Sequence, residues 1–494
     1  MFNTLKTFTR TKPLFLFLLP LFFVLHGYTG NYDFVPVKDA LLLVAFYMGC
    51  GIVLALIFML VYRNIPRACL AAFIVLAFHF FFGSFHDTLK KIAPGSLISK
   101  YAFVIPFYLV CLLIILFLVK RKKPSLLRST YYLNGLLILF CLLDLGWLTT
   151  RIISQSKKNN QSIPEGMVAC DTCARPDVFL IIADEYAGNH ELKDILGFDN
   201  QAFLDSLTRK GFHLMRESYS NYQFTPISVS SILNMDYIDP DKREKGTSEM
   251  TYFYRKVRDN PFLRFLEHYD YRFYNYSYFD FKGQDAPSKE SLMPSKTKLI
   301  TSQTFLSRVD RDLRYYLVTF FHSKKEMKRL VYSSRSVNQD LFDRTLATAG
   351  EKTEQPKFVF THLMMPHFQY YYDKNGKEFP YEQLVEGTQH LQKNYLEYLQ
   401  YTNKKLLQLV DHIKETATKP PIILLMGDHG FRHFTQVIDT SYYFRNLMSV
   451  YLPSGKYEAF KPNLTAVNFL RALLNTEFGQ HMPYLKDHKI FYHY

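Results

Sequence analysis

The sequence predicts an N-terminal bundle of apolar α-helices followed by an α/β domain whose mostly parallel sheet lies between helices. Three observations predict this fold. Residues 1–150 contain five apolar stretches separated by short, often basic loops. Residues 151–175 form a polar linker with a Cys-x-x-Cys motif. In residues 176–494, short β-branched and aliphatic runs alternate with helical patterns, which is the rhythm of β-α-β units.

The five apolar stretches are predicted membrane spans. The last four approach or exceed the roughly 17–25 residues that a helix needs to cross the hydrocarbon core of a bilayer. The first is shorter and follows basic residues, as a signal peptide does, but no small-x-small cleavage site follows it, so we expect an uncleaved anchor. The stretches cover residues 13–25, 40–62, 69–85, 101–119 and 131–149.

The basic residues of the loops predict the orientation of the spans. With a cytoplasmic N-terminus, most of them lie on the cytoplasmic side, as the positive-inside rule requires. These are Lys6, Arg10, Lys12, Arg63, Arg67, Lys120, Arg121, Lys122, Lys123 and Arg128, while Lys90, Lys91 and Lys100 lie outside. Five spans then place residues after 149 on the far side. We expect a multi-pass protein of the plasma (inner) membrane with a periplasmic or extracellular C-terminal domain.

The net charge of +15 comes almost entirely from the predicted membrane region. The first 158 residues carry 17 Lys and Arg against 4 Asp and Glu, a net of +13. A nucleic-acid-binding domain would carry its basic residues on the folded domain, where the balance here is only +2. We therefore expect no nucleic-acid partner.

The cysteines indicate the redox compartment. Four of the six lie in the predicted spans, where a free cysteine acts as a small apolar residue. Cys170 and Cys173 lie outside them, and in an oxidising compartment we expect a local disulfide. A redox-active pair is the alternative, but no thioredoxin-like strand and helix surround the motif.

The strands of the α/β domain predict where a site lies. Parallel sheets bind ligands at the carboxyl ends of their strands. We expect strands at residues 177–183, 212–215, 271–278, 357–362 and 421–426, and helices at 200–210 and 389–414. The residues that follow positions 183, 360 and 426 are therefore the candidates for binding and catalysis.

Acidic side chains follow the first and the last of these three strands. Asp184 and Glu185 come after the first, and two carboxylates there are costly unless a cation meets them. Asp428 and His429 come after the last, between two glycines that let the backbone turn sharply. A carboxylate oxygen beside an imidazole nitrogen suits zinc or manganese. The alternatives are an N-cap for Asp184 and an ordinary turn for the Asp-His pair.

Two further positions complete the candidate chemistry. His367 follows the middle strand and is a candidate for holding a substrate oxyanion or a second metal, while His362 is interpreted as a possible core residue. Thr225 is predicted to be the N-cap of a helix with Pro226 at its first position. A plain cap is one interpretation. A helix N-terminus also attracts phosphate, so a hydroxyl there that a metal activates is a candidate nucleophile.

Taken in order, these elements resemble the sulfatase-like branch of the alkaline phosphatase superfamily. They are Pro-Asp-x-x-x-Ile-Ile-x-Asp184, Thr225, Pro366-His367 and Gly427-Asp428-His429-Gly430. With several spans ahead of an exported domain, the chain resembles the membrane-bound lipoteichoic-acid synthases and lipid A phosphoethanolamine transferases. The similarity covers residues 176–494 and implies an alkaline-phosphatase-like fold for them.

The resemblance also implies roles for individual residues. Asp184, Asp428 and His429 would hold one divalent metal ion, zinc or manganese, and a second metal is left open. Thr225 would be the nucleophile and a further metal ligand. His367 would contact the transferred group or the leaving oxygen.

The resemblance implies less specific roles for Glu185, which follows Asp184, and for Arg432, which lies near the Asp428-His429 pair. Glu185 stands where many sulfatases have a second Asp ligand. Arg432 follows the Asp-His pair and would meet an anionic substrate or form a structural ion pair.

One departure from the family pattern decides between reactions. Sulfatases form formylglycine from Cys or Ser in a Cys-x-Pro-Ser-Arg pattern, whereas this chain has Thr225-Pro-Ile-Ser-Val229. Threonine cannot form that aldehyde. We therefore predict a phosphotransferase or phosphodiesterase with a phospho-threonine intermediate, a lipid headgroup donor, and an envelope glycan or lipid as acceptor. The alternatives are a sulfatase-like ester hydrolase and a non-catalytic protein of envelope assembly.

Overall fold

The chain divides into two compact units, which are described separately. The computed structural model describes residues 11–121, 126–158, 164–170, 173–243, 248–287, 295–385 and 387–493. The helical unit comprises residues 1–160 and 289–322, and the α/β unit comprises residues 161–288 and 323–494. Lys6, Arg10, Lys122 and Lys123 of the predicted cytoplasmic loops lie outside the described residues.

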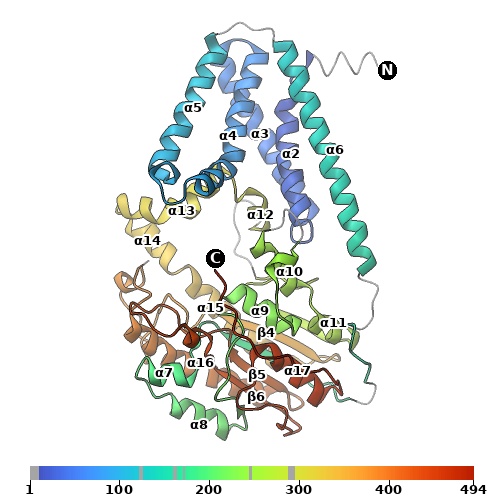
Figure 1. Ribbon diagram of the computed structural model, residues 1–494, viewed down its shortest axis with the longest axis vertical. Coiled ribbons are helices and arrows are strands. Elements are labelled where there is room, and N and C mark those ends of the chain that lie inside the picture. Colours follow the sequence, from blue (N-terminus) through green and yellow to red (C-terminus); the bar gives the residue numbers. More distant parts are fainter. Residues whose placement is uncertain are drawn as a thin grey trace. The chain divides into compact units, whose positions relative to one another are not determined.

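The helical unit is built on long apolar helices (Figure 1). Four of those described are long and apolar enough to cross a membrane, judged by length and composition. They are α3 (Val37–Tyr62), α4 (Ile65–Ile92), α5 (Tyr101–Arg121) and α6 (Leu126–Lys158), preceded by the shorter α2 (Phe15–Asn31). This apolar bundle confirms the N-terminal part of the predicted fold. The predicted total of five spans stays a prediction, because α2 has only 17 residues.

A later segment of the chain also belongs to the helical unit. It contains α12 (Lys298–Thr301) and α13 (Phe305–Phe320), and the short helix η3 (Ser295–Thr297) precedes them; η1 (Leu97–Ser99) joins α4 to α5. The backbone amide of Gly83 in α4 donates to the carbonyl of Gln303 at 2.8 Å. A Cβ at residue 83 would lie 2.6 Å from that carbonyl oxygen, so only glycine permits the approach.

The α/β unit contains one six-stranded sheet in the order β2-β6-β5-β1-β4-β3. Only β6 runs antiparallel to its neighbours, so the sheet is mostly parallel, as predicted. The strands are β1 (Val178–Ala183), β2 (His213–Leu214), β3 (Arg272–Tyr276), β4 (Lys357–Leu363), β5 (Ile422–Gly427) and β6 (Met448–Tyr451). All six residues of β1 are completely buried, as expected for a central strand covered on both faces.

Helices cover both faces of this sheet (Figure 1). Alternate residues of β1, β4 and β5 pack against α9, α11 and α17 in one continuous core. On the other face, Thr345 of α15 hydrogen-bonds Thr361 of β4. The helices of the unit are α7 (Asn189–Asp194), α8 (Gln201–Arg209), α9 (Thr225–Asn234), α10 (Glu249–Arg258), α11 (Pro261–His268), α14 (Lys324–Val331), α15 (Ser333–Ala349), α16 (Gln392–Thr416) and α17 (Ala466–Glu477), with the short helices η2 (Pro240–Lys242), η4 (Tyr381–Gln383) and η5 (Thr440–Phe444).

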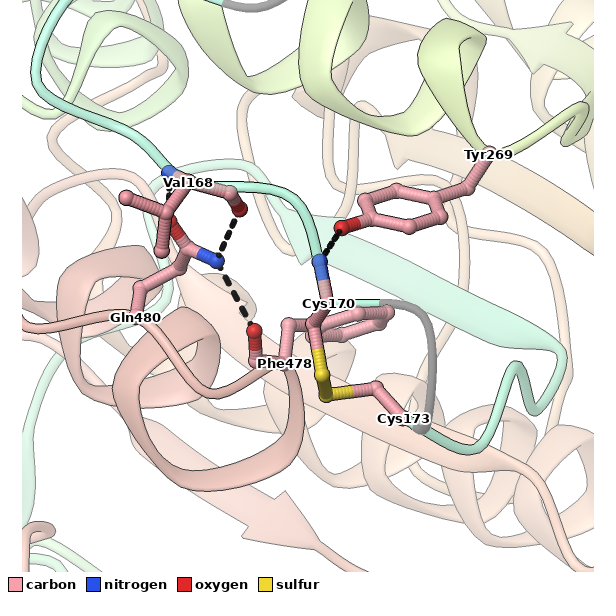
Figure 2. Close-up of a disulfide and its surroundings, with 6 residues drawn as sticks. All are labelled: Val168, Cys170, Cys173, Tyr269, Phe478 and Gln480. Carbon is pink, nitrogen blue, oxygen red and sulfur yellow. Dashed lines mark hydrogen bonds between the residues drawn. A yellow bond between two sulfur atoms is a disulfide. The ribbon is translucent and has the colours of Figure 1, made fainter.

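The linker ahead of β1 is attached to the α/β unit by a disulfide-containing segment (Figure 2). Cys170 and Cys173 form the predicted disulfide, while residues 171–172 between them lie outside the described residues. The Cys170 amide donates to the Tyr269 hydroxyl at 2.6 Å. The Gln480 side chain accepts from the Val168 amide at 2.9 Å and donates to the Val168 carbonyl at 2.8 Å. These three hydrogen bonds fix the linker to the ends of α11 and α17, whereas the disulfide joins two residues of the linker itself.

Candidate active site

Three parallel strands end side by side and bring the predicted site residues to one edge of the sheet. Ala183 at the end of β1 is in register with Leu363 of β4 on one side and Gly427 of β5 on the other. The Asp184 amide donates to the Leu363 carbonyl at 2.9 Å. The residues that follow β1 and β5 are therefore neighbours, as the carboxyl-end rule leads one to expect.

Asp184 and Asp428 meet at this edge together with His362 of β4. Their ligand atoms lie within 4.8 Å of one another, and all three residues are at most 5% exposed. The His362 Nε2 lies 3.4 Å from Asp184 Oδ2. Asp184 Oδ1, Asp428 Oδ2 and both His362 ring nitrogens have no hydrogen-bond partner among the described residues. Buried polar atoms of this kind are costly unless something absent from the chain itself satisfies them.

The two carboxylates influence each other electrostatically. Burial raises the pKa of Asp428 above its usual range, and the negative charge of Asp184 adds to this effect. Burial also works to raise the pKa of Asp184, but His367, His362 and His429 together hold it below its ordinary value. Asp428 is therefore the carboxyl that holds a proton more readily in the metal-free protein.

Thr225 is the first residue of α9, which corrects the prediction that it is the N-cap. Phe224 is the N-cap, because its extended backbone (φ −131°, ψ 123°) precedes the helix, and no side chain caps the helix end. The Thr225 hydroxyl is consequently not used by the helix. Its Oγ1 lies 3.2 Å from the Nε2 of His429. The structure thus brings the candidate nucleophile to the Asp-His pair.

The backbone fixes which nitrogen of His429 faces Thr225. The ring Nδ1 lies 2.8 Å from the Gly430 carbonyl, which only accepts hydrogen bonds, so Nδ1 carries the hydrogen. Burial, with a smaller contribution from Arg432, lowers the pKa of His429 to about 3. The neutral ring then directs the lone pair of Nε2 toward Thr225 and toward Asp428 Oδ2, which is 3.4 Å away.

Glu185, His367 and His433 form a second group, whose ligand atoms also lie within 4.8 Å of one another. The Glu185 backbone has a φ of +59°, a left-handed conformation that non-glycine residues seldom adopt outside functional sites. Glu185 Oε1 lies 3.4 Å from His433 Nε2, whereas Oε2 has no partner among the described residues. The Glu185 carboxylate therefore belongs to a different group from that of Asp184, although it follows Asp184 directly.

Arg432 forms the ion pair that was one of its two predicted roles. Its Nε lies 3.8 Å from Glu185 Oε1, and its backbone amide donates to the same oxygen at 3.2 Å. The Nδ1 of His367 donates to the Phe368 carbonyl at 2.5 Å, which leaves Nε2 for the group. Burial works to lower the pKa of His367, but Asp184 and Glu185 raise it above its ordinary value.

A family model described as Sulfatase matches residues 176–473, which is more than half of the chain. The chain belongs to the sulfatase family. The match confirms the resemblance inferred from the order of Asp184, Thr225, His367 and the Asp428-His429 pair. No curated protein matches the chain at a significant level.

Several solved structures are similar to this sulfatase-family chain. The C-terminal periplasmic domain of EcEptC from Escherichia coli in complex with Zn has 9% identity over 64% of this chain and 86% of that one, with a TM-score of 0.40. The corresponding domain of phosphoethanolamine transferase EptC from Campylobacter jejuni has 12%, 62%, 91% and 0.36 for the same quantities. The phosphonate monoester hydrolase SpPMH from Silicibacter pomeroyi has 15% identity over 62% of this chain and 74% of that one, with a TM-score of 0.40.

The site of this sulfatase-family chain fits a divalent cation. Two ligands about 2.0–2.1 Å from a tetrahedral zinc ion lie roughly 3.3 Å apart. Three atom pairs of the site have this spacing: Thr225–His429 at 3.2 Å, His429–Asp428 at 3.4 Å and His362–Asp184 at 3.4 Å. Oxygen and imidazole nitrogen are donors that suit zinc and manganese. The unpaired, buried oxygens supply the negative charge that such an ion needs.

Two members of the site were not predicted from the sequence. His362 was interpreted as a possible core residue, and no role was predicted for His433. His362 is paired with Ile182, one residue before the end of β1, and this register is not readable from the sequence. The close spacing of His433 to Asp428 was the one available signal for it. Gly430 also avoids a steric clash, because a Cβ there would lie 2.4 Å from Glu191 Oε2.

Glu191 supports the loop that follows β5, and we expect its replacement to change the pH dependence of stability. It is completely buried, and its Oε2 accepts from the Phe431 amide at 3.2 Å. Burial raises its pKa well above the ordinary value. The stability that the neutral acid contributes is therefore full below the unfolded pKa of about 4.3 and is lost as the pH rises. Glu191→Gln should flatten this loss, as measured by thermal unfolding between pH 5 and pH 9.

Two further variants make the Glu191 prediction specific. Glu191→Ala leaves the Phe431 amide without an acceptor and should cost about 1–3 kcal/mol at low pH, and less as the pH rises and the wild type loses the contribution of Glu191. Glu382→Gln changes an exposed carboxylate and serves as the control. A Glu191→Gln variant whose unfolding follows the wild-type pH dependence would contradict the assignment of a neutral buried acid.

Proposed function

We propose that this protein is a metal-dependent phosphotransferase or phosphodiesterase, anchored in a membrane, with Thr225 as nucleophile. One observation carries the proposal: Thr225 Oγ1 lies 3.2 Å from His429 Nε2, which is 3.4 Å from Asp428 Oδ2, an oxygen without a hydrogen-bond partner in the part of the chain that the structure describes. Membership of the sulfatase family supports an ester-cleaving enzyme. Phosphoryl transfer is favoured over sulfate-ester hydrolysis, because threonine cannot form formylglycine.

Asp184, Asp428, His429 and Thr225 would hold the ion, and His362 is placed to contribute. A divalent cation bound there supplies Lewis acidity, which lowers the pKa of the Thr225 hydroxyl and offsets charge on the phosphoryl oxygens. The residues on the other side, Glu185, His367 and His433, form the group that would contact the transferred phosphoryl group or hold a second ion.

The proposed reaction proceeds in two displacements. In the first, the Thr225 Oγ–P bond forms and the P–O bond to the donor's leaving group breaks. The hydroxyl of Thr225 loses its proton and the leaving oxygen gains one. The raised pKa of His367 favours the protonated imidazolium, which can donate that proton. The N-terminus of α9 carries a partial positive charge that favours the phosphoryl group. In the second, an acceptor hydroxyl or water attacks phosphorus and restores Thr225.

The proposed substrates are a lipid headgroup donor and an envelope glycan or lipid acceptor, used outside the cytoplasm. The apolar helices support a position at a membrane surface. The Cys170–Cys173 disulfide supports an oxidising compartment, since cytosolic thiols are kept reduced. The absence of a basic surplus in residues 159–494 supports a partner other than nucleic acid.

The test compares phosphorus and sulfur esters on the full-length protein in phospholipid nanodiscs with added zinc or manganese. We expect p-nitrophenolate release from bis(p-nitrophenyl) phosphate and none from p-nitrophenyl sulfate. With headgroup-labelled phosphatidylethanolamine in the nanodisc, the label should appear on Thr225 by mass spectrometry. Release of sulfate alone would make the protein a sulfate-ester hydrolase, and no turnover with no bound metal would identify a non-catalytic member.

A further inference from the structure

The helical unit contains a partly open cavity with largely apolar walls. Its volume is about 620 Å³, which is in the range of sites for small organic ligands. Leu54 of α3, Leu76 of α4 and Leu109 of α5 are among the side chains that line it. All three helices are long and apolar enough to cross a membrane. The part of a ligand that enters between them is therefore mainly hydrocarbon.

Polar residues from the later segment of the chain line the same cavity. They are Thr297, Lys298, Thr301, Thr304 and Ser307, which belong to η3, α12 and the start of α13. Thr304 caps α13 by accepting from the Ser307 amide at 3.4 Å, and Lys298 is exposed. The cavity thus combines hydrocarbon walls with hydroxyl groups and one cationic side chain, which is the chemistry of an amphiphile site.

A histidine also faces the cavity from within a predicted span. His79 of α4 lines the cavity, and among the described residues its ring makes aromatic contacts with Tyr47 and Phe80 rather than a hydrogen bond. A titratable side chain inside a membrane helix is costly and generally faces a polar group or a pathway. Its position indicates that the ligand, or water that accompanies it, brings polar atoms into the cavity.

Helix α13 places the polar end of the cavity at the level of the lipid headgroups. Its apolar side chains lie on one face and are exposed: Leu306 (65%), Tyr316 (69%), Leu317 (41%), Phe320 (74%) and the following Phe321 (72%). Its other face is held by Arg308, which is 5% exposed and donates to Asp87 at 2.5 Å. A helix whose apolar face is exposed in this way is typical of a position in the plane of the membrane interface. Figure 1 shows α12 and α13 at one end of the long helices.

We propose that this cavity binds one glycerophospholipid, with its acyl chain between α3, α4 and α5 and its phosphate beside Lys298. The hydrocarbon walls select the chain, and the cationic and hydroxyl groups select the phosphate. The site belongs entirely to the helical unit, so the proposal does not depend on the reaction proposed above.

The first test fills the cavity and uses a neighbour on the same helix as control. Leu109 lines the cavity, whereas Leu113, one turn further along α5, is 65% exposed and does not. The full-length protein is delipidated in detergent, incubated with dioleoyl phosphatidylglycerol and examined by native mass spectrometry. Leu109→Trp should reduce the bound lipid about 10-fold, and Leu113→Trp should not. Equal retention by the two variants would overturn the proposal.

The second test uses the natural cysteines and needs no variant of uncertain folding. Cys50 lines the cavity and Cys111 does not, and both are free thiols. Phosphatidylglycerol should slow maleimide labelling of Cys50 about 10-fold and leave Cys111 unchanged, which corresponds to tight occupancy of one site. Equal effects on both cysteines would show general lipid coating and would overturn the proposal.

A third comparison tests the phosphate. Dioleoylglycerol has the same chains without the phosphate and should protect Cys50 several-fold less than phosphatidylglycerol. Lys298→Gln should remove this difference, while Lys100→Gln, an exposed lysine that does not line the cavity, should keep it. Equal protection by the two lipids in the wild-type protein would overturn the assignment of the phosphate to Lys298.

Discussion

Replacing Thr225 by alanine is expected to abolish turnover while the α/β unit stays folded. The hydroxyl oxygen lies 3.2 Å from His429 Nε2, and it does not cap α9. Loss of a nucleophile that acts together with its activating partners costs at least about 10³-fold in kcat. Because no helix hydrogen bond is lost, the melting temperature should change by no more than about 2 °C. Steady-state kinetics and thermal unfolding of the same preparations measure both effects.

A conservative variant and a covalent label make the Thr225 prediction specific. Thr225→Ser retains the hydroxyl and should retain measurable turnover. The phosphoryl adduct trapped at low pH should be found on residue 225 and not on Ser228, whose hydroxyl donates to the Asp428 carbonyl at 2.7 Å. Turnover at the wild-type rate by Thr225→Ala would exclude Thr225 as the nucleophile.

Asp428→Asn is expected to destroy metal binding and to stabilise the metal-free protein. The Oδ1 of Asp428 accepts from the amides of Glu185 and His429 at 2.9 and 3.0 Å, and an asparagine oxygen keeps both bonds. The change removes one negative charge beside Asp184. Loss of a residue that only hydrogen-bonds a metal ligand typically lowers metal affinity roughly 10- to 100-fold, and loss of a direct ligand should lower it more. Calorimetric zinc titration and elemental analysis measure this loss.

The pH dependence of the metal-free protein provides an independent readout for Asp428. Because the pKa of Asp428 is raised by burial and by Asp184, its contribution to stability is full below about pH 4 and is lost as the pH rises toward neutrality. The contribution of Asp428 should therefore make the metal-free wild-type protein unfold at a lower temperature at pH 7 than at pH 5. Asp428→Asn should remove that contribution.

The response to metal separates the two forms further. Zinc at 100 times its Kd should stabilise the wild type by roughly 2.7 kcal/mol and leave Asp428→Asn unchanged. Asp241→Asn, which changes a carboxylate that is 97% exposed, is the matched control. Equal stabilisation of both proteins by zinc would place the ion elsewhere.

The parts of the fold that were predictable are those in which local pattern and burial agree. β1 and β5 are almost entirely apolar because both faces of a central strand are covered, and β4 contains the shorter apolar run 358–360. β6, with four residues, is too short to stand out from its surroundings. Helix α13 has the polar and apolar faces of any surface helix. Its place in the helical unit depends on the pairing of Arg308 with Asp87, 221 residues apart in the chain, which no local pattern encodes.

The predictable part of the site follows the same logic. Asp184 and Asp428 were found because they directly follow strands, and the rule for carboxyl ends places such residues together. The separation of Asp184 from Glu185 into two groups depends on a left-handed backbone at residue 185, which a glutamate gives no reason to expect. Helix α9 begins one residue earlier than predicted, so Thr225 is not the N-cap and its hydroxyl does not cap the helix. Boundaries of this kind are the least readable feature of a sequence.

The chain passes between the two units three times, near residues 160, 288 and 322. A recombinant fragment that begins after the long helices therefore still carries α13 with its four exposed apolar side chains and the following Phe321, which would make it prone to aggregate in aqueous buffer. A well-behaved soluble fragment needs a second excision, of residues 289–322, with a flexible Gly-Ser bridge in their place. Crystallisation or screening work on the isolated α/β unit should begin from that internally deleted form.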